Sequence, residues 1–174
     1  MNSFLQRFMY PFRVQVSYPD RILEVIAFVL FIVAWMLTIA VYQQAPEQIP
    51  THFNMNGVAT QWSTKSTIWG VSAVFTFAYL IAFASVYNHK LVNMPIRLKA
   101  EVLERQLHLM SRMSRFMSIL VNVLWISALV SISGSFMSIS SFAVQLMLKV
   151  SFVLLFIPAI YYSLKIWWIG RNYR

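Results

Sequence analysis

The sequence has no cysteine and few charged residues, and each shortage narrows the chemistry that the chain can perform. Without cysteine, neither disulfide bonds nor thiolate metal sites can form. Only 11% of the residues are charged, against about a quarter in soluble domains, whereas 59% are hydrophobic. These proportions exclude an ordinary soluble domain and indicate a membrane protein.

Long apolar runs account for most of the chain. Runs of roughly 18 or more residues are typical of transmembrane helices, and the predicted spans cover residues 22–42, 68–88, 116–137 and 142–163. The first run lacks a small-residue cleavage site, so we expect it to be retained rather than removed as a signal peptide. We therefore predict an all-α membrane protein, a four-helix transmembrane bundle forming a single domain over residues 1–174.

Lysines and arginines are unevenly distributed between the predicted loops. They cluster in the N-terminal arm, the 89–115 loop and the C-terminal tail, whereas Lys65 is the only one in the 43–67 loop. The positive-inside rule then places both termini and the 89–115 loop in the cytoplasm, with the 43–67 loop outside. The net charge of +9 is explained by the anionic lipids of the inner leaflet, so we expect no nucleic-acid partner.

The outer 43–67 loop contains a compact polar segment. Asn56-Gly57 is a strong hairpin signal, because a type I′ turn needs two residues with positive φ. Pairing about that turn sets Thr51 against Trp62 and predicts a short extracytoplasmic hairpin. The apolar residues expected to pack on the helix ends are Ile49, Phe53 and Trp62.

This loop holds too few reactive groups for catalysis or metal binding. A metal site needs three or four ligands, and Glu47 and His52 are the only strong ones. No serine or threonine stands at a diagnostic distance from His52, so we predict no enzyme and no cofactor. His52 and Asn54 either hydrogen-bond the loop backbone or form a binding surface, and Lys65 either reaches the headgroups or pairs with Glu47.

The 89–115 loop has the pattern of an amphipathic helix that runs into the third span. Asn93 is a possible cap and Pro95 suits the first turn. Glu101–Arg105 and Glu104–His108 are pairs four residues apart that would support the exposed face. The apolar stripe favours a cytoplasmic helix lying on the membrane surface, or a docking face for a cytoplasmic partner. Its members are Ile96, Ala100, Leu103, Leu107, Met110 and Met117.

Two charged residues fall inside the predicted spans. Glu24 lies near the inner boundary beside Arg21, where a local pair or water suffices. Lys149 lies about 10 Å below the outer edge at 1.5 Å per residue, on the same helix face as Gln145. Lys149 either reaches the outer headgroups, or contacts the outer loop or the serines of the third span. Those serines are Ser127, Ser131 and Ser135.

Two motifs resemble the bacterial membrane-protein family known as domain of unknown function 1648. The first comprises Pro46, Ile49, Pro50, His52, Phe53, Asn54, Gly57, Trp62 and Lys65. The second comprises Asn93, Pro95, Glu101, Glu104, Arg105 and Gln106. One departure is Thr60, where the family commonly has Asp. The resemblance implies a multi-pass protein of the bacterial inner membrane, in a family that includes an immunity protein against a sporulation-delaying toxin and has no assigned activity.

Two functions are compatible with these features. The first is a non-enzymatic ligand- or peptide-binding, sensing or immunity-type protein that uses the outer loop for recognition. The second is an accessory subunit or small component of a membrane transporter, for which Lys149 and Pro158 are the only suggestive residues.

Overall fold

The computed structural model describes residues 16–53, 59–88, 91, 98–134 and 141–172. Its helices are α2 (Tyr18–Gln44), α3 (Thr67–Tyr87), α4 (Leu103–Gly134) and α5 (Ser141–Asn172), with a short 3-10 turn, η2 (Ala100–Val102). The strands are β1 (Gln48–Phe53) and β2 (Ala59–Thr64). All 4 long helices are apolar enough to cross a membrane, which confirms the predicted class of mostly helical, multi-pass membrane protein.

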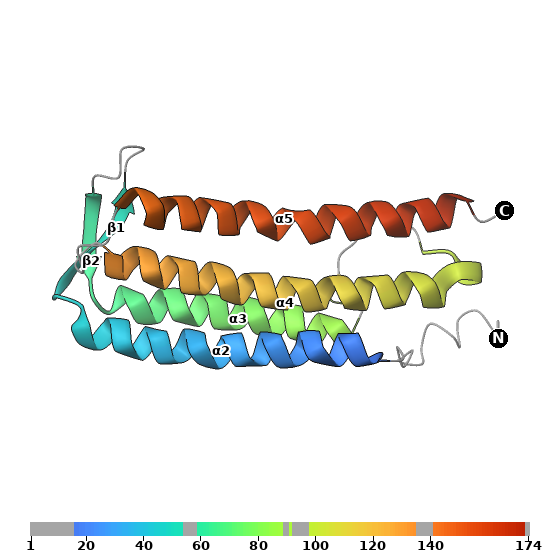
Figure 1. The fold of residues 1–174 in the computed structure, drawn as a ribbon, viewed down its shortest axis with the longest axis horizontal. Helices are drawn as coiled ribbons and strands as arrows, with labels where there is room; N and C mark the ends of the chain where they lie inside the picture. Colours follow the sequence, from blue (N-terminus) through green and yellow to red (C-terminus); the bar gives the residue numbers. More distant parts are fainter. Residues whose placement is uncertain (1–15, 54–58, 89–90, 92–97, 135–140, 173–174) are drawn as a thin grey trace.

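The helices are arranged around α4. It packs against α2, α3 and α5, whereas α2 and α3 touch each other lightly and α5 packs mainly on α4. The strands lie at one end of the bundle, and α2 begins and α5 ends at the other (Figure 1). We call these the strand end and the terminal end.

Two apolar clusters form the core, one toward each end. The cluster at the strand end combines α2, β1, α3 and α4 and contains Ala34, Val41, Ala45, Ile49, Ile68, Trp125 and Leu129. The cluster at the terminal end joins α4 to α5 and contains Val102, Leu103, Leu107, Leu109, Met110, Met113, Tyr162, Ile166 and Ile169. The second cluster exists because both helices extend well past the length of a simple span.

The predicted amphipathic helix is the first part of α4. Residues 103–117 are continuous with the rest of α4, and Leu107 and Met110 pack with Ile166 of α5. The apolar stripe is thus covered by α5, which corrects the expectation of a face free to lie on lipid. Neither the Glu101–Arg105 nor the Glu104–His108 pair is formed among the described residues, and Asn93, Pro95 and Ile96 lie outside them.

Helix lengths show how the bundle fits a bilayer. At 1.5 Å per residue, the 32 residues of α4 and of α5 each extend about 48 Å, against about 30 Å for the hydrocarbon core. The excess lies at the terminal end, where residues 103–111 of α4 pack on residues 163–172 of α5. We call this helix pair the stalk.

Candidate functional site: a strand pair and an ion layer

The strand pair is antiparallel but not regular. Ile49 lies opposite Ser63, Pro50 opposite Trp62, and His52 opposite Gln61, with irregularities between Pro50 and Phe53. The predicted pairing of Thr51 with Trp62 is therefore wrong, because Thr51 is an extra residue bulged out of β1. Its hydroxyl lies 3.2 Å from the Ser63 hydroxyl and donates to the Gln61 carbonyl at 3.4 Å.

The two faces of the strand pair differ in burial. Ile49 is 0% exposed and belongs to the core cluster at the strand end, whereas Trp62 is 57% exposed. The expectation that Trp62 packs on the helix ends is therefore wrong. Pro50, the cross-strand partner of Trp62, is buried like Ile49, so the exposed part of this surface is the Trp62 side chain on β2.

An ion pair closes the base of the strand pair. Lys65 Nζ lies 2.6 Å from Glu47 Oε1, and the Lys65 backbone N–H donates to the Glu47 carbonyl at 3.0 Å. The Lys65 ammonium also lies 5.6 Å from the centre of the Tyr42 ring. Of the two interpretations of Lys65, the structure contains the pair with Glu47. The hydrogen bond and charge of Glu47 raise the pKa of Lys65.

His52 is exposed on β1 and makes no side-chain hydrogen bond to any described residue. The predicted bond from His52 to the loop backbone is thus absent from this part of the chain, and the imidazole is accessible. Asn54 and Gly57 lie outside the described residues. Among the residues that the structure describes, no three His, Cys, Asp or Glu side chains gather to hold a metal ion.

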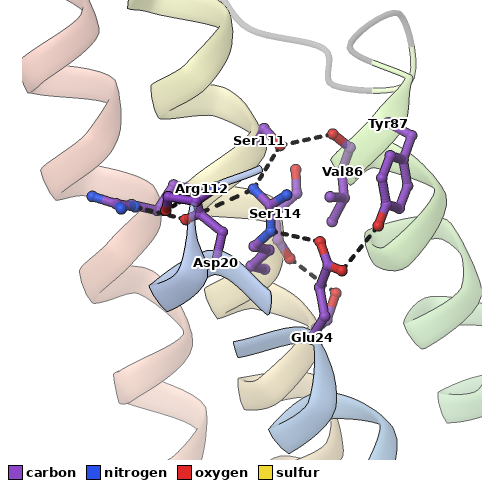
Figure 2. A network of polar contacts seen from close by, with 10 residues as sticks. Asp20, Glu24, Val86, Tyr87, Ser111, Arg112 and Ser114 are labelled. Atoms are coloured by element: carbon purple, nitrogen blue, oxygen red, sulfur yellow. Dashed lines mark hydrogen bonds and ion pairs between the residues drawn. The ribbon is translucent and has the colours of Figure 1, made fainter. Parts of the chain in front are cut away.

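A second group of polar residues joins three helices toward the terminal end, and we call it the ion layer (Figure 2). Arg115 Nε of α4 donates to Glu24 Oε1 of α2 at 2.8 Å, and the Tyr87 hydroxyl of α3 donates to Glu24 Oε2 at 2.9 Å. Arg112 Nε donates to Asp20 Oδ1 at 3.0 Å, and Arg115 Nη1 lies 4.0 Å from the same oxygen. Two carboxylates and two guanidinium groups thus balance in charge.

Burial makes the ion layer unusual. Asp20 is 0% and Arg115 1% exposed, although charges removed from water are costly unless they are paired and hydrogen-bonded. Arg115 Nη1 donates to the Ser111 hydroxyl at 2.8 Å, and that hydroxyl donates to the Val86 carbonyl of α3 at 2.8 Å. The two arginines of α4 therefore hold the two acidic residues of α2, and the Ser111 hydroxyl links α4 to α3.

Sequence reasoning missed this layer. Glu24 was expected to be satisfied by Arg21 or by water, and Arg112 and Arg115 were considered only among the charges of the 89–115 loop, whereas in the structure Glu24 pairs with Arg115. The available signal was the matching placement of the charges. Asp20 and Glu24 lie one turn apart at the start of one span, and Arg112 and Arg115 lie one turn apart just before another.

Between the ion layer and the strand end, buried polar side chains link the same three helices. Trp125 Nε1 donates to the Ser72 hydroxyl at 3.2 Å, and Ser72 lies 3.0 Å from the Thr38 hydroxyl. Asn122 Nδ2 donates to the Ala27 carbonyl at 2.9 Å. The deep indole of Trp125 therefore has the partner that a buried N–H requires.

The predicted intramembrane pair on α5 is more isolated. Lys149 is exposed, Gln145 is half-buried, and Lys149 forms no hydrogen bond or ion pair with any described residue. The Ser127 hydroxyl, one of the expected contacts, lies 2.8 Å from the Ser151 hydroxyl instead. The predicted contacts of Lys149 with the outer loop and the α4 serines are thus absent from this part of the chain.

Within the second motif, Gln106 is the buried member. Its side-chain oxygen accepts from the Lys99 backbone N–H at 3.0 Å, and its amide donates to the Ile166 carbonyl at 3.2 Å. Gly170 permits this contact, since a Cβ there would lie 3.0 Å from Gln106 Nε2. Glu101, Glu104 and Arg105 are exposed, so among the described members of this motif Gln106 is the one that contacts α5.

Comparison with known proteins gives one match. Residues 29–76 match the family described as Domain of unknown function (DUF1648). The matched segment runs from α2 through both strands into α3, and it confirms the recognition made on the first motif. No curated protein and no solved structure matches the chain.

Proposed function

We propose that this membrane protein, whose residues 29–76 match a domain of unknown function, is a non-enzymatic receptor-like or immunity-type protein. It binds a ligand or peptide on the exposed face of its strand pair. The observation that supports this proposal is the 57% exposure of Trp62 on a strand pair whose other face is held in the core by Ile49. Exposed Trp on a rigid support is typical of recognition surfaces.

The strand pair is rigid enough to present such a surface. Ile49 packs with Ile68 and Leu129, the Glu47–Lys65 pair closes its base, and Thr51 links the two strands. A ligand would therefore meet Trp62 and the accessible His52 with little ordering cost. The charge distribution supports an orientation in the bacterial inner membrane with this face outside and the stalk in the cytoplasm.

Ligand binding at the strand pair is transmitted along α4. Leu129 packs with Ile49 at the strand end, and the same helix carries Arg115 of the ion layer about 21 Å away at 1.5 Å per residue. Arg115 contacts α2 directly and reaches α3 through Ser111 and Glu24. A shift of α4 would thus change its contacts with both α2 and α3.

The test is a peptide-sensitivity assay in cells that lack the gene. Cells are complemented with wild type, Trp62→Ala, His52→Ala, or Gln48→Ala, a control that alters an exposed residue of the same strand pair. We expect wild type and Gln48→Ala to restore resistance to at least one antimicrobial peptide, and Trp62→Ala to lose it. Equal protection by all variants at matched membrane levels would refute the proposed surface.

A transport component is the second candidate, because Lys149 is exposed on a membrane-spanning helix without a partner among the described residues. Intramembrane charges commonly mark substrate or subunit contacts. Uptake or efflux that is lost in Lys149→Ala and retained in Trp62→Ala would favour this function over recognition by the strand pair.

A further inference from the structure

The α5 half of the stalk has an aromatic and cationic outer face. Trp167 and Trp168 are exposed beside the exposed cations Lys165 and Arg171. No aspartate or glutamate occurs anywhere in α5. The other half of the stalk differs, because Glu101 of η2 and Glu104 of α4 are exposed there together with Lys99 and Arg105, so that its charges balance.

Both cations of this face fold back by one helical turn. Lys165 Nζ lies 5.5 Å from the centre of the Tyr161 ring, and the Arg171 guanidinium carbon lies 5.0 Å from that of Trp167. Helical side chains lean toward the N-terminus of their helix, which for α5 is the strand end. The two charges are therefore displaced from the tip of the stalk toward the membrane-spanning part of the bundle.

The depth of this face follows from two contacts. Phe116 and Tyr162 stack with ring centres 5.9 Å apart, so Tyr162 lies level with the ion layer. From Arg115 to Gly134, α4 extends about 29 Å at 1.5 Å per residue, close to the thickness of the hydrocarbon core. Lys165 and Trp167, three and five residues past Tyr162, then lie about 4.5 Å and about 7.5 Å beyond the hydrocarbon edge, within and at the outer limit of a headgroup layer about 5–7.5 Å thick.

We propose that two cation–aromatic pairs on the two flanks of α5, Lys165 with Tyr161 and Arg171 with Trp167, dock the phosphate headgroups of anionic lipids in the leaflet at the terminal end. The rings lie in the interface, as Trp and Tyr do in membrane proteins. The cations that lie over the Tyr161 and Trp167 rings meet the lipid phosphates. This surface is separate from the strand pair, so it does not rest on the proposed recognition function.

The experiment measures lipid binding to the full-length protein in mild detergent by mass spectrometry of intact complexes. Phosphatidylglycerol and phosphatidylcholine are titrated against wild type, the double variant Lys165→Gln/Arg171→Gln, and the control Arg105→Gln. The control removes one exposed cation from the α4 half of the same stalk, where Glu101 and Glu104 are exposed as well. Circular dichroism verifies that each variant retains its helices.

We expect wild type to prefer phosphatidylglycerol, and Arg105→Gln to keep that preference within about 2-fold. At roughly fivefold per cation near an anionic surface, the double variant should bind phosphatidylglycerol about 25-fold more weakly. An unchanged preference in the double variant, or an equal loss in Arg105→Gln, would overturn the proposal. Displacement of the lipid by soluble polyglutamate would also overturn it, in favour of an acidic protein partner.

Discussion

The ion layer allows one quantitative prediction about stability. Replacing Arg115 with methionine removes the 2.8 Å bond to Glu24, the bond to Ser111 and the 4.0 Å approach to Asp20. Methionine keeps most of the volume and adapts to irregular surroundings. The main cost is therefore electrostatic, because two carboxylates lose a shared counter-charge.

The structure sets the size of that cost. Breaking a buried ion pair by removing one partner costs about 3–5 kcal/mol. Asp20 keeps Arg112, and Glu24 keeps the Tyr87 hydroxyl and 19% side-chain exposure. We therefore expect the lower end, about 3 kcal/mol for Arg115→Met. Adding Glu24→Gln should recover part of it, with a coupling energy of about 2 kcal/mol between the two sites.

The assay is unfolding in mixed micelles of mild detergent and dodecyl sulfate, followed by circular dichroism. Wild type, Arg115→Met, Glu24→Gln and the double variant form a double-mutant cycle. Arg105→Met serves as the control, since it makes the same exchange at an exposed site of the same helix, and it should cost less than about 0.5 kcal/mol.

Two results would refute this reasoning. One is a cost for Arg115→Met no larger than that for Arg105→Met, which would mean that the buried guanidinium contributes no net stability. The other is strict additivity of Arg115→Met and Glu24→Gln, which would mean that the 2.8 Å contact carries no coupling.

Further predictions concern the stalk, the core and the strand pair. Gln106→Ala should lower the free energy of unfolding by about 2 kcal/mol, because two hydrogen bonds are lost. Gly170→Ala should be destabilising in wild type and neutral in the Gln106→Ala background, because the added Cβ would lie 3.0 Å from the Gln106 amide nitrogen. Chemical unfolding of the two single variants and the double variant checks both expectations. Trp125→Phe should cost about 1 kcal/mol by the same assay, through the lost bond to Ser72, whereas an equal loss in a Ser72→Ala background would contradict that assignment. Glu47 raises the pKa of Lys65 above its ordinary value of 10.5. The Glu47–Lys65 pair therefore stabilises the fold fully below pH 10.5, and this stabilisation is lost as the pH rises through the raised pKa of Lys65 in the folded protein. The protection of the strand amides against hydrogen exchange should thus stay constant near neutral pH and fall only in strong alkali. A loss of protection between pH 7 and 9 would contradict a stabilising role of the Glu47–Lys65 pair.

The strand pair shows where prediction from sequence succeeds and where it stops. The Pro-bracketed segment and its Asn-Gly turn are local signals, and they mark the region that matches the unknown-function family. The bulge at Thr51 depends on how Ile49 enters a core built from three helices. Local sequence does not contain that constraint, so the register and the exposure of Trp62 were predicted wrongly.

The stalk shows the same limit for an amphipathic pattern. The apolar stripe that includes Leu107 and Met110 indicates that one face of the helix avoids water, but it does not indicate what covers that face. Only the position of α5, with Ile166 and Gln106 in contact, shows that a helix covers it. Whether lipid or a helix covers this face therefore depends on contacts between residues about 60 positions apart in the sequence.

By itself, the sequence determined that four helices are long and apolar enough to cross a membrane, because hydrocarbon thickness and backbone hydrogen bonding limit what can span one. It also determined the region of the family motif. Tertiary structure decided which charges meet, since Asp20 and Glu24 reach Arg112 and Arg115 across about 90 residues. Periodicity and composition describe one helix at a time, whereas an ion pair of this kind is a property of three helices packed together.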